Sequence, residues 1–397
     1  MKRILFLGGA PSQIPPIEYA KSQGFYVITC DYLPSNPGHQ LADEYHNVST
    51  TDKEAVLILA KELEIDGIVA YASDPAAPTA AYVAEKLGLP GNPYESVLTL
   101  ARKDLFRKFL KDHNFNVPKS ESFYDLESAE HWVSQIKFPL FIKPVDSSGS
   151  KGVTEIKDIT QLKAAFNYAL QFSREKKVVI EEKIVKQGYQ IDSDIFFADG
   201  KLKFWIWGNQ HNDTECSQYA PIAISYPSVL DSNVQQEARD IIENILKELK
   251  FIQGAFNVEF LIDEDNKVWV LEIGPRNGGN LIPEVIRYAV GADLIKATVD
   301  VALGLNCDYL TQENAKGFWS SYLIHSLGDG IFEKLECSDR VKSMIREQTL
   351  YVSKGDVVKK YSGSNDTLGM MILEYPNMQT MLEMIDNMEH DIRVVTK

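Results

Sequence analysis

Short apolar runs alternate with amphipathic stretches through the first 95 residues of the chain. The runs Ile4–Leu7, Phe25–Cys30 and Gly67–Tyr71 have the length of buried strands. Between and after them, Lys53–Glu64 and Pro78–Leu87 have helical spacing. Strands that alternate with helices predict right-handed βαβ units and a parallel sheet, whose ligands bind at the carboxyl ends of the strands. The residues expected to line one crevice there are Gly8–Gln13, Asp31, Ser73 and Asp74.

The pattern changes after residue 95. Residues 96–120 contain a basic stretch whose apolar side chains at positions 105, 106, 109 and 110 have helical spacing. Farther along, the turn signal Asp199-Gly200 joins Ile195–Phe197 to Lys203–Trp207 as a hairpin, and two more strands follow at Gly254–Ile262 and Lys267–Ile273. Residues 121–305 are therefore predicted to be α+β with antiparallel hairpins.

Residues 306–397 contain further strands and one closing helix. Met378, Met381, Met384 and Met388 are three or four positions apart, so they share one face of that helix. We interpret the stripe as core packing rather than as a partner surface.

Composition and charge exclude several classes of function. Hydrophobic residues make up 44% and charged residues 24% of the 397 positions, as in ordinary globular proteins, so disorder is excluded. A net charge of −15 argues against a broad basic face, and no nucleic-acid partner is expected. No apolar run approaches 18 residues, so no membrane partner is expected either. The four cysteines form no C-x-x-C pair, which favours a reducing cytosol, and we expect a cytoplasmic protein.

An acidic chain that handles anions must place its few cations where they are needed, and one stretch stands out. A strand ends at Lys143, and a loop rich in serine and glycine, Ser147–Gly152, follows it. Small residues let backbone N–H groups approach phosphate oxygens, while the lysine neutralises their charge. The order of a Walker A loop is absent. An ordinary surface turn is the alternative interpretation.

A second stretch has the features of a nucleotide-base contact. Val178–Glu182 is an apolar strand that continues into Lys183 and Ile184. An extended backbone with apolar neighbours can hydrogen-bond an adenine edge, and a later side chain can hold a ribose hydroxyl. An amphipathic strand with exposed Glu and Lys is the alternative.

Two carboxylates interrupt apolar strands farther on. Glu259 lies in Phe256–Ile262 and Glu272 lies in Val268–Ile273. An acid at a core-facing strand position is costly unless it is paired or binds metal, and a hairpin can place both acids on one face. Their oxygens suit Mg²⁺, and Arg276 in the following turn can stabilise phosphoryl charge. Buried pairing with Arg or Lys is the alternative.

Taken in order, these stretches resemble the ATP-grasp superfamily over residues 1–305. The resemblance rests on an initial α/β domain followed by Lys103, Lys143 with its loop, Glu181–Ile184, Glu259 and Glu272. It implies a mixed α/β and α+β fold, in which a parallel domain precedes a two-lobed ATP-grasp fold with antiparallel sheets. The implied parts are a pre-ATP-grasp domain (1–95), a linker helix (96–120), a small lobe (121–205), a large lobe with the metal site (206–305) and a C-terminal α+β portion (306–397).

The resemblance also implies roles for individual residues. Arg276 and Lys143 are the expected catalytic residues, and the cofactors are ATP with Mg²⁺ or Mn²⁺. The expected metal ligands are Glu259, Glu272 and Asn277. The expected ATP contacts are Lys103, Lys143, Ser147, Ser148, Gly149, Gly152, Glu181, Glu182, Lys183, Ile184 and Gln190.

Two positions depart from the family pattern. Gln190 stands where relatives often have a ribose-binding Glu. Gly274 stands in Glu-Ile-Gly-Pro-Arg, where many relatives read Glu-Ile-Asn-Pro-Arg and use the Asn as a metal ligand. Asn277 or a water molecule can take that place. We expect Glu259 and Glu272 to suffice for metal-dependent ATP binding.

The implied activity is that of an ADP-forming carbon–nitrogen ligase. ATP phosphorylates a substrate carboxylate, and an amine attacks the acyl phosphate. The chain most resembles carboxylate–amine ligases related to the carbamoyl phosphate synthase large subunit and to amino-acid ligases. Its partners would be a small carboxylate and an amine, such as an amino acid, and related ligases are often homodimers. The alternatives are a purine-pathway ligase for bicarbonate or formate and a catalytically weak ATP-binding protein.

Other features carry less weight. A dinucleotide-binding oxidoreductase is disfavoured because G-x-G-x-x-G is absent and Pro11 removes an N–H group. The segment from Trp205 to Pro221 lies where substrate-specific loops are expected, although its aromatic residues also suit a strand core. The seven histidines show no metal-ligand spacing, and we interpret His211 and His325, in polar loop-like surroundings, as structural or substrate-proximal.

Overall fold

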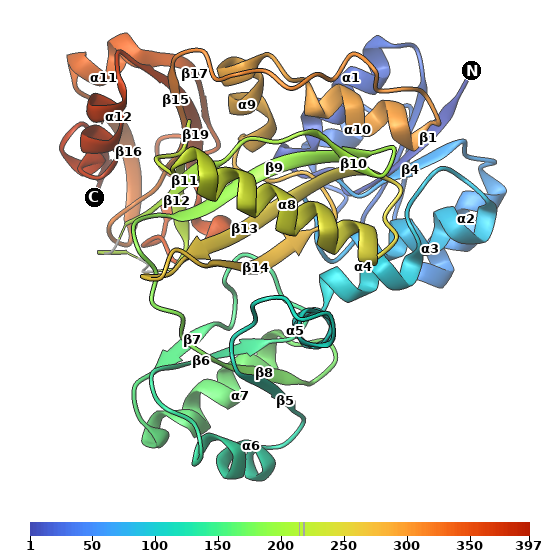
Figure 1. Cartoon of the computed structure of the whole chain (residues 1–397). Coiled ribbons are helices and arrows are strands. Elements are labelled where there is room, and N and C mark those ends of the chain that lie inside the picture. Colours follow the sequence, from blue (N-terminus) through green and yellow to red (C-terminus); the bar gives the residue numbers. More distant parts are fainter. Residues whose placement is uncertain (214, 217–218) are drawn as a thin grey trace.

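The computed structural model describes residues 1–213, 215, 216 and 219–397. Within these residues, four sheets and their helices form a broad body with one projecting lobe (Figure 1). In the same part of the chain, no helix has the length and apolar character needed to cross a lipid bilayer.

The chain begins with a parallel sheet, as predicted. Its strands follow the order β3 (Glu44–His46), β2 (Tyr26–Cys30), β1 (Arg3–Leu7) and β4 (Gly67–Val69). Alternate residues of β1 enter two different cores, because side chains of a strand point to opposite faces. One face packs on α2 (Lys53–Glu62) and α3 (Ala77–Leu87). The other packs on α1 (Ile14–Ser22) and on the distant α10 (Leu294–Ala302), which fixes this domain to the rest of the body.

The predicted linker helix is two helices. Between α4 (Tyr94–Ala101) and α5 (Lys103–Asp112), Arg102 adopts an extended conformation with φ −115° and ψ 112°. The break places Lys103 at the start of α5, where its backbone N–H donates to Val145 O at 2.8 Å. The linker is thereby tied to the strand that precedes the Gly-rich loop.

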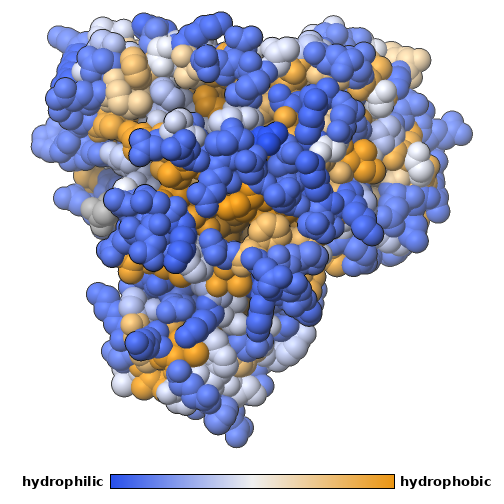
Figure 2. All heavy atoms as spheres, viewed as in Figure 1, coloured by the Kyte–Doolittle hydropathy of each residue, from blue (hydrophilic) through white to orange (hydrophobic). Residues whose placement is uncertain are grey.

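The projecting lobe is a small α+β unit. Its strands follow the order β5 (Ser120–Phe123), β8 (Val178–Glu182), β6 (Leu140–Pro144) and β7 (Thr154–Ile156), and α6 (Leu126–Val133) and α7 (Leu162–Phe172) cover one face. Figure 2 shows the lobe as a separate mass below the body, with apolar residues in the hollow between them.

A long antiparallel sheet forms the centre of the body. Its main path contains β14 (Val268–Gly274), β13 (Gln253–Ile262), β9 (Gln190–Ala198), β11 (Gly208–Asn212), β12 (Pro221–Tyr226), β15 (Phe318–Ile324), β19 (Gly369–Tyr375) and β17 (Ile345–Leu350), and β10 (Lys201–Phe204) pairs with β9. The predicted hairpin of β9 and β10 therefore forms, but in this sheet. The expected small-lobe boundary at 205 is corrected, because β9 pairs with β13 over eight positions and not with the small-lobe strands.

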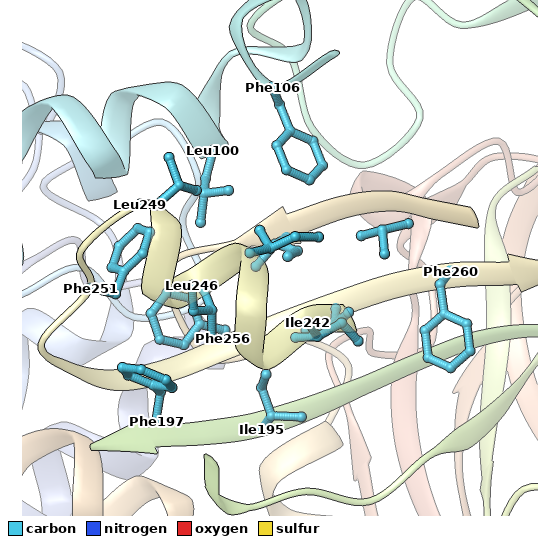
Figure 3. Packing of buried hydrophobic residues seen from close by; sticks show 14 of the residues in the cluster. Leu100, Phe106, Ile195, Phe197, Ile242, Leu246, Leu249, Phe251, Phe256 and Phe260 are labelled. Carbon is cyan, nitrogen blue, oxygen red and sulfur yellow. The ribbon is translucent and has the colours of Figure 1, made fainter. Parts of the chain in front are cut away.

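One face of this sheet is covered by α8 (Ser232–Glu248). Figure 3 shows Leu246 of the helix beside Phe256 of the sheet, and Ile242 on the side of Ile195 and Phe260. Trp207 also lies in this core, with its ring centroid 5.0 Å from that of Phe260, so it does not line a pocket. The helix α8 covers the face of the sheet on which the apolar side chains of β13 and β14 lie. The side chains at the alternate positions of both strands therefore project from the opposite face.

The C-terminal portion extends the central sheet with β15, β17 and β19 and also forms a small sheet of its own. That sheet has the order β18 (Val357–Val358), β16 (Gly330–Cys337) and β20 (Ile392–Thr396). The helices of this portion are α11 (Asp339–Met344) and α12 (Met378–Ile385). Met381, Met384 and Met388 are buried in the core beneath α12, and Met378 packs against it. The methionine stripe is thus core packing, as predicted, although α12 ends before Met388. Helix α9 (Ile282–Val290) packs against β15 on the body side.

Candidate functional site

Three carboxylates form a row across neighbouring strands. The register pairs Asp192 of β9 with Glu259 of β13, and Glu259 with Glu272 of β14. Opposed residues of antiparallel strands project from the same face, with Cβ atoms about 4.5–5.5 Å apart. The hairpin therefore places the two predicted acids on one face, and the fold adds Asp192, which the sequence analysis did not identify.

A second polar row lies beside the first. Asn257 is opposed to Asp194 on one side and to Gly274 on the other. Asn257 Nδ2 donates to Asp192 Oδ1 at 2.7 Å and to Asp194 Oδ1 at 3.2 Å. The Gly278 N–H donates to both carboxylate oxygens of Asp194 at 2.8 Å, which holds the turn after β14 against the sheet.

Burial and crowding make these acids retain protons. Burial, together with the charges of Asp192 and Glu272, raises the pKa of Glu259 to about 8. Burial likewise raises the pKa of Asp192 to about 6 and that of Asp194 to about 7. Gln190 Nε2 donates to Glu259 Oε2 at 2.9 Å. The acids bring several oxygen atoms close together without enough positive charge nearby to balance them. Such a set of hard oxygen ligands fits Mg²⁺ or Mn²⁺.

Basic side chains border this carboxylate row. Lys103 Nζ lies 3.1 Å from Glu272 Oε2 and donates to Ser147 O at 3.0 Å. Arg276 forms two hydrogen bonds to Asp74, from Nε to Oδ1 and from Nη2 to Oδ2, both at 2.7 Å. The linker, the Gly-rich loop and the first domain thus meet beside the acids.

Glu181 lies in a buried ion-pair network. It accepts from Arg107 Nε at 2.9 Å and from Lys143, which comes from the neighbouring strand. Although burial disfavours the ionised form, these two cations lower the pKa of Glu181 to about 2. Arg107 Nη1 also donates to Leu271 O at 2.8 Å, which ties the lobe to β14. The Glu181 side chain is therefore committed to Lys143 and Arg107, and Arg107 is a second residue that the sequence analysis missed.

The Gly-rich loop depends on left-handed backbone conformations. Gly149, Ser150 and Gly152 have φ values of 64°, 57° and 77°. A Cβ atom at Gly152 would also lie 2.9 Å from Cδ2 of Phe172. Ser150 Oγ donates to Tyr219 O at 3.2 Å, so the loop contacts the connection between β11 and β12. The ATP contacts expected of Ser147, Ser148, Gly149 and Gly152 remain predictions.

The structure explains one departure from the family pattern and corrects one expectation. A Cβ atom at Gly274 would lie 2.8 Å from Asp74 Oδ1 and 3.0 Å from Arg276 Cζ, so the ion pair occupies the space that an asparagine would need. Asn277 does not replace that ligand, because its Oδ1 accepts from Thr298 Oγ1 at 2.7 Å and no hydrogen bond in the described chain joins its side chain to the acids. Asp192 and Asn257 lie on the acidic face instead.

The expected crevice at the end of the parallel sheet is largely filled. Gln13 Nε2 donates to Leu7 O at 3.1 Å and to Tyr71 O at 2.9 Å, which closes the ends of β1 and β4. Asp31 accepts from Asn36. Asp74, which was also expected in this crevice, pairs with Arg276.

The expected loop positions of the two histidines are corrected in part. His211 lies within β11, buried, with Nδ1 2.7 Å from Asp386 Oδ1, because its strand runs through the middle of the sheet. His325 follows the last residue of β15 and pairs with Asp213. Neither histidine contacts the carboxylate row.

A cavity of about 630 Å³ opens beside the site. Its lining includes Lys53 and Asp74 of the first domain, Arg102 of the linker, Ser147 of the loop and Glu272 of the carboxylate row. The cavity therefore joins four parts of the chain, with charges of both signs on its walls.

Comparison with known proteins agrees with this geometry. The ATP-grasp domain family matches residues 108–280. The chain is 28% identical to a formate-dependent phosphoribosylglycinamide formyltransferase of Prochlorococcus marinus, over 69% of this chain and 70% of that protein. It is also 28% identical to the carbamoyl phosphate synthase large chain of a Thermoanaerobacter species, over 58% of this chain but only 21% of that protein.

Among solved structures, an L-amino acid ligase from Bacillus licheniformis superimposes with a TM-score of 0.83 at 18% identity, over 100% of this chain and 99% of the other. That likeness extends the shared fold beyond residues 108–280 to the first domain and the C-terminal portion. The matched domain begins within α5 and includes the Gly-rich loop and the hairpin of β13 and β14, which carries Glu259 and Glu272. On these grounds residues 108–280 are an ATP-grasp domain.

Proposed function

We propose that this protein is an ATP-dependent carbon–nitrogen ligase that activates a carboxylate as an acyl phosphate and joins it to an amine. The observation that carries the proposal is the carboxylate row Asp192–Glu259–Glu272, with Lys103 and Arg276 beside it. ATP-grasp relatives with carbon–nitrogen ligase names support the same class of reaction.

In this proposal the acidic residues bind the metal and the basic residues bind the phosphates. Glu259 and Glu272, assisted by Asp192, would hold Mg²⁺ or Mn²⁺, which neutralises phosphate oxygens when it is bound with ATP. Lys143 and Lys103 approach from the lobe and the linker, where they would bind the phosphates. Arg276, which is held by Asp74, would stabilise charge on the transferring phosphoryl group.

The Gly-rich loop is the proposed cover of the reaction. An acyl phosphate is destroyed by water, so the site must be closed while the amine attacks. Ser147 contacts Lys103 and Ser150 contacts the β11–β12 connection, so the loop spans the entrance from both sides. The backbone of Glu181–Ile184 and the side chain of Gln190 are the proposed adenine and ribose contacts.

Two substrate classes have support. The cavity of about 630 Å³ has room for an amino-acid-sized carboxylate, and the similarity to an L-amino acid ligase favours this class. The similarity to a formate-dependent formyltransferase favours a small acid such as formate or bicarbonate with a larger amine. We further propose that the protein is cytoplasmic, acts on small molecules and assembles as a homodimer.

The test is ATP-dependent release of phosphate with pooled carboxylates and pooled amines. Release that needs one acid and one amine, with formation of the amide detected by mass spectrometry, supports the ligase. Formate or bicarbonate as the required acid would assign the small-acid class. Binding of Mg·ATP without turnover under any pair would leave only an ATP-binding protein and reject the ligase.

Variants connect the activity to the site. Glu272→Ala and Glu259→Ala should each abolish Mg·ATP binding in isothermal titration, and wild-type affinity in both would reject the metal assignment. Glu374→Ala, in the distant strand β19, is the matched control, because Glu374 pairs only with exposed Arg346 in the described structure.

A further inference from the structure

Three side chains that can bind a metal lie together in the fold, and none of them belongs to the carboxylate row. Asp213 and Cys216 follow β11, and His325 follows β15. One carboxylate oxygen, the thiol sulfur and one ring nitrogen lie within 4.8 Å of one another. The cluster brings together the β11–β12 connection and the C-terminal portion of the chain.

The hydrogen bonds of His325 determine which ring nitrogen faces the cluster. Nδ1 lies 2.8 Å from Leu323 O, and a carbonyl can only accept, so Nδ1 carries a hydrogen. Nε2 lies 3.1 Å from Asp213 Oδ2. In a neutral ring Nε2 therefore presents a lone pair to the carboxylate, and a cation between them can bind both, whereas a doubly protonated ring would pair with Asp213 directly. Donation of Nδ1–H to a backbone carbonyl is also the typical arrangement of a metal-binding histidine.

Cys216 supplies a sulfur atom to the cluster. All four cysteines are free, and the Cys216 thiol donates to Ser326 O at 3.8 Å. A metal of the zinc class binds the thiolate and displaces the thiol proton on binding.

We propose that Asp213, Cys216 and His325 form a second metal site, of the zinc class, with water at the fourth position. Sulfur and imidazole ligands select Zn²⁺ over Mg²⁺, in contrast to the all-oxygen carboxylate row. In tetrahedral zinc sites the ligand atoms lie about 3.2–3.7 Å apart. His325 Nε2 and Asp213 Oδ2 are already 3.1 Å apart, and the three ligand atoms of the cluster lie within 4.8 Å of one another.

The site would also restrain the entrance of the nucleotide site. The same connection carries Tyr219, whose carbonyl accepts from Ser150 of the Gly-rich loop. The Tyr219 hydroxyl contacts Glu155 of β7 in the small lobe. A metal that ties Asp213 and Cys216 to His325 therefore fixes one end of a segment that contacts the lobe.

The test uses cobalt as a spectroscopic substitute in the full chain. Chelator-treated protein, free of ATP and Mg²⁺, is titrated with Co²⁺. We expect an intense near-ultraviolet thiolate-to-cobalt charge-transfer band that saturates at about one equivalent and is bleached by Zn²⁺. Cobalt at Glu259 and Glu272 cannot give this band, because those ligands contain no sulfur.

Cysteine variants identify the ligand. Cys216→Ser should lose the band, and Cys337→Ser, which changes another partly buried cysteine, should keep it. His325→Gln should weaken Zn²⁺ binding at least tenfold in competition with a chromophoric chelator. No band in the wild-type protein, or a band that survives Cys216→Ser, overturns the proposal.

A measurement on the wild-type chain covers the case in which a variant misfolds. Alkylation of each cysteine is followed by mass spectrometry with and without Zn²⁺. Zinc should protect Cys216 at least tenfold and leave Cys337 unchanged. Equal alkylation of Cys216 in both conditions would also overturn the site, whatever the outcome for the ligase activity.

Discussion

Arg276 and Asp74 form a two-point ion pair between residues 202 positions apart in the sequence. Asp74 lies in the loop after β4 of the first domain, and Arg276 lies in the turn after β14 of the carboxylate hairpin. Both side chains are mostly buried, with 12% and 16% of their surfaces exposed. The pair therefore fixes the position of the proposed catalytic arginine and attaches the first domain to the site.

Asp74→Asn tests this positioning role. The substitution keeps the size of the side chain but leaves the Arg276 charge without its partner, so we expect a loss of about 1–3 kcal/mol in the free energy of unfolding. Turnover should fall more than Mg·ATP affinity, since Arg276 is proposed to act on the transferring phosphoryl group. Denaturant titration and steady-state kinetics measure the two effects.

The control for Asp74→Asn is Glu374→Gln. Glu374 Oε2 is contacted by Arg346 Nε at 2.8 Å and Nη2 at 2.7 Å, but this pair is about 40% exposed, so the loss should be at most about 1 kcal/mol. Equal losses in the two variants would contradict the importance of the buried pair.

Gly274→Asn tests why the chain departs from the family pattern. Restoring the asparagine should lower stability and activity, because its Cβ atom would lie 2.8 Å from Asp74 Oδ1. In an Asp74→Ala background the space is vacated, and the added cost of Gly274→Asn should shrink. A double-mutant cycle on thermal midpoints measures this coupling, and strictly additive effects would show that the pair does not exclude the asparagine.

The raised pKa of Glu259, about 8, predicts a pH dependence. The folded protein without metal holds a proton that the unfolded chain releases near pH 4.3, so this contribution to stability is present at low pH and is lost as pH rises toward about 8. Mg²⁺ needs the ionised carboxylate, so its affinity should increase over the same range. Thermal midpoints with and without Mg²⁺ at several pH values test both trends. Glu259→Gln should flatten them, and an unchanged pH profile in that variant would assign the effect to other groups.

Lys143→Met tests the proposed phosphate contact. Lys143 is held by Glu181 in the described structure and is only partly buried, so it can also face a ligand at the end of its strand. We expect ATP affinity to fall at least tenfold in isothermal titration. Lys203→Met is the control. Lys203 lies on β10 and pairs with exposed Asp199, so its replacement should leave ATP affinity unchanged. A nucleotide affinity that is equal in both variants would remove Lys143 from the site.

Glu181→Gln should act on stability. Arg107 would remain buried with its charge unpaired, at a cost of about 3 kcal/mol. Urea unfolding measures the loss, and Glu182→Gln, at the neighbouring and more exposed position, is the control. Similar midpoints for both variants would mean that the Arg107–Glu181 contact contributes little.

The sequence by itself determined much of the local structure and indicated the resemblance to ATP-grasp proteins. Apolar runs marked β13 and β14 and showed that Glu259 and Glu272 interrupt them, because the run and its interruption are both visible in the residues of the strand itself. Lys143 before the Gly-rich loop was visible for the same reason, since strand and loop adjoin in the chain.

Only the tertiary structure decided which distant residues complete the site. Asp192 lies 67 positions before Glu259, and the pairing of β9 with β13 brings them together. Arg107 and Asp74 likewise gain their roles from contacts with Glu181 and Arg276. Such contacts depend on the register and packing of strands and domains, which no local pattern specifies, because many partners satisfy the same hydrophobic periodicity.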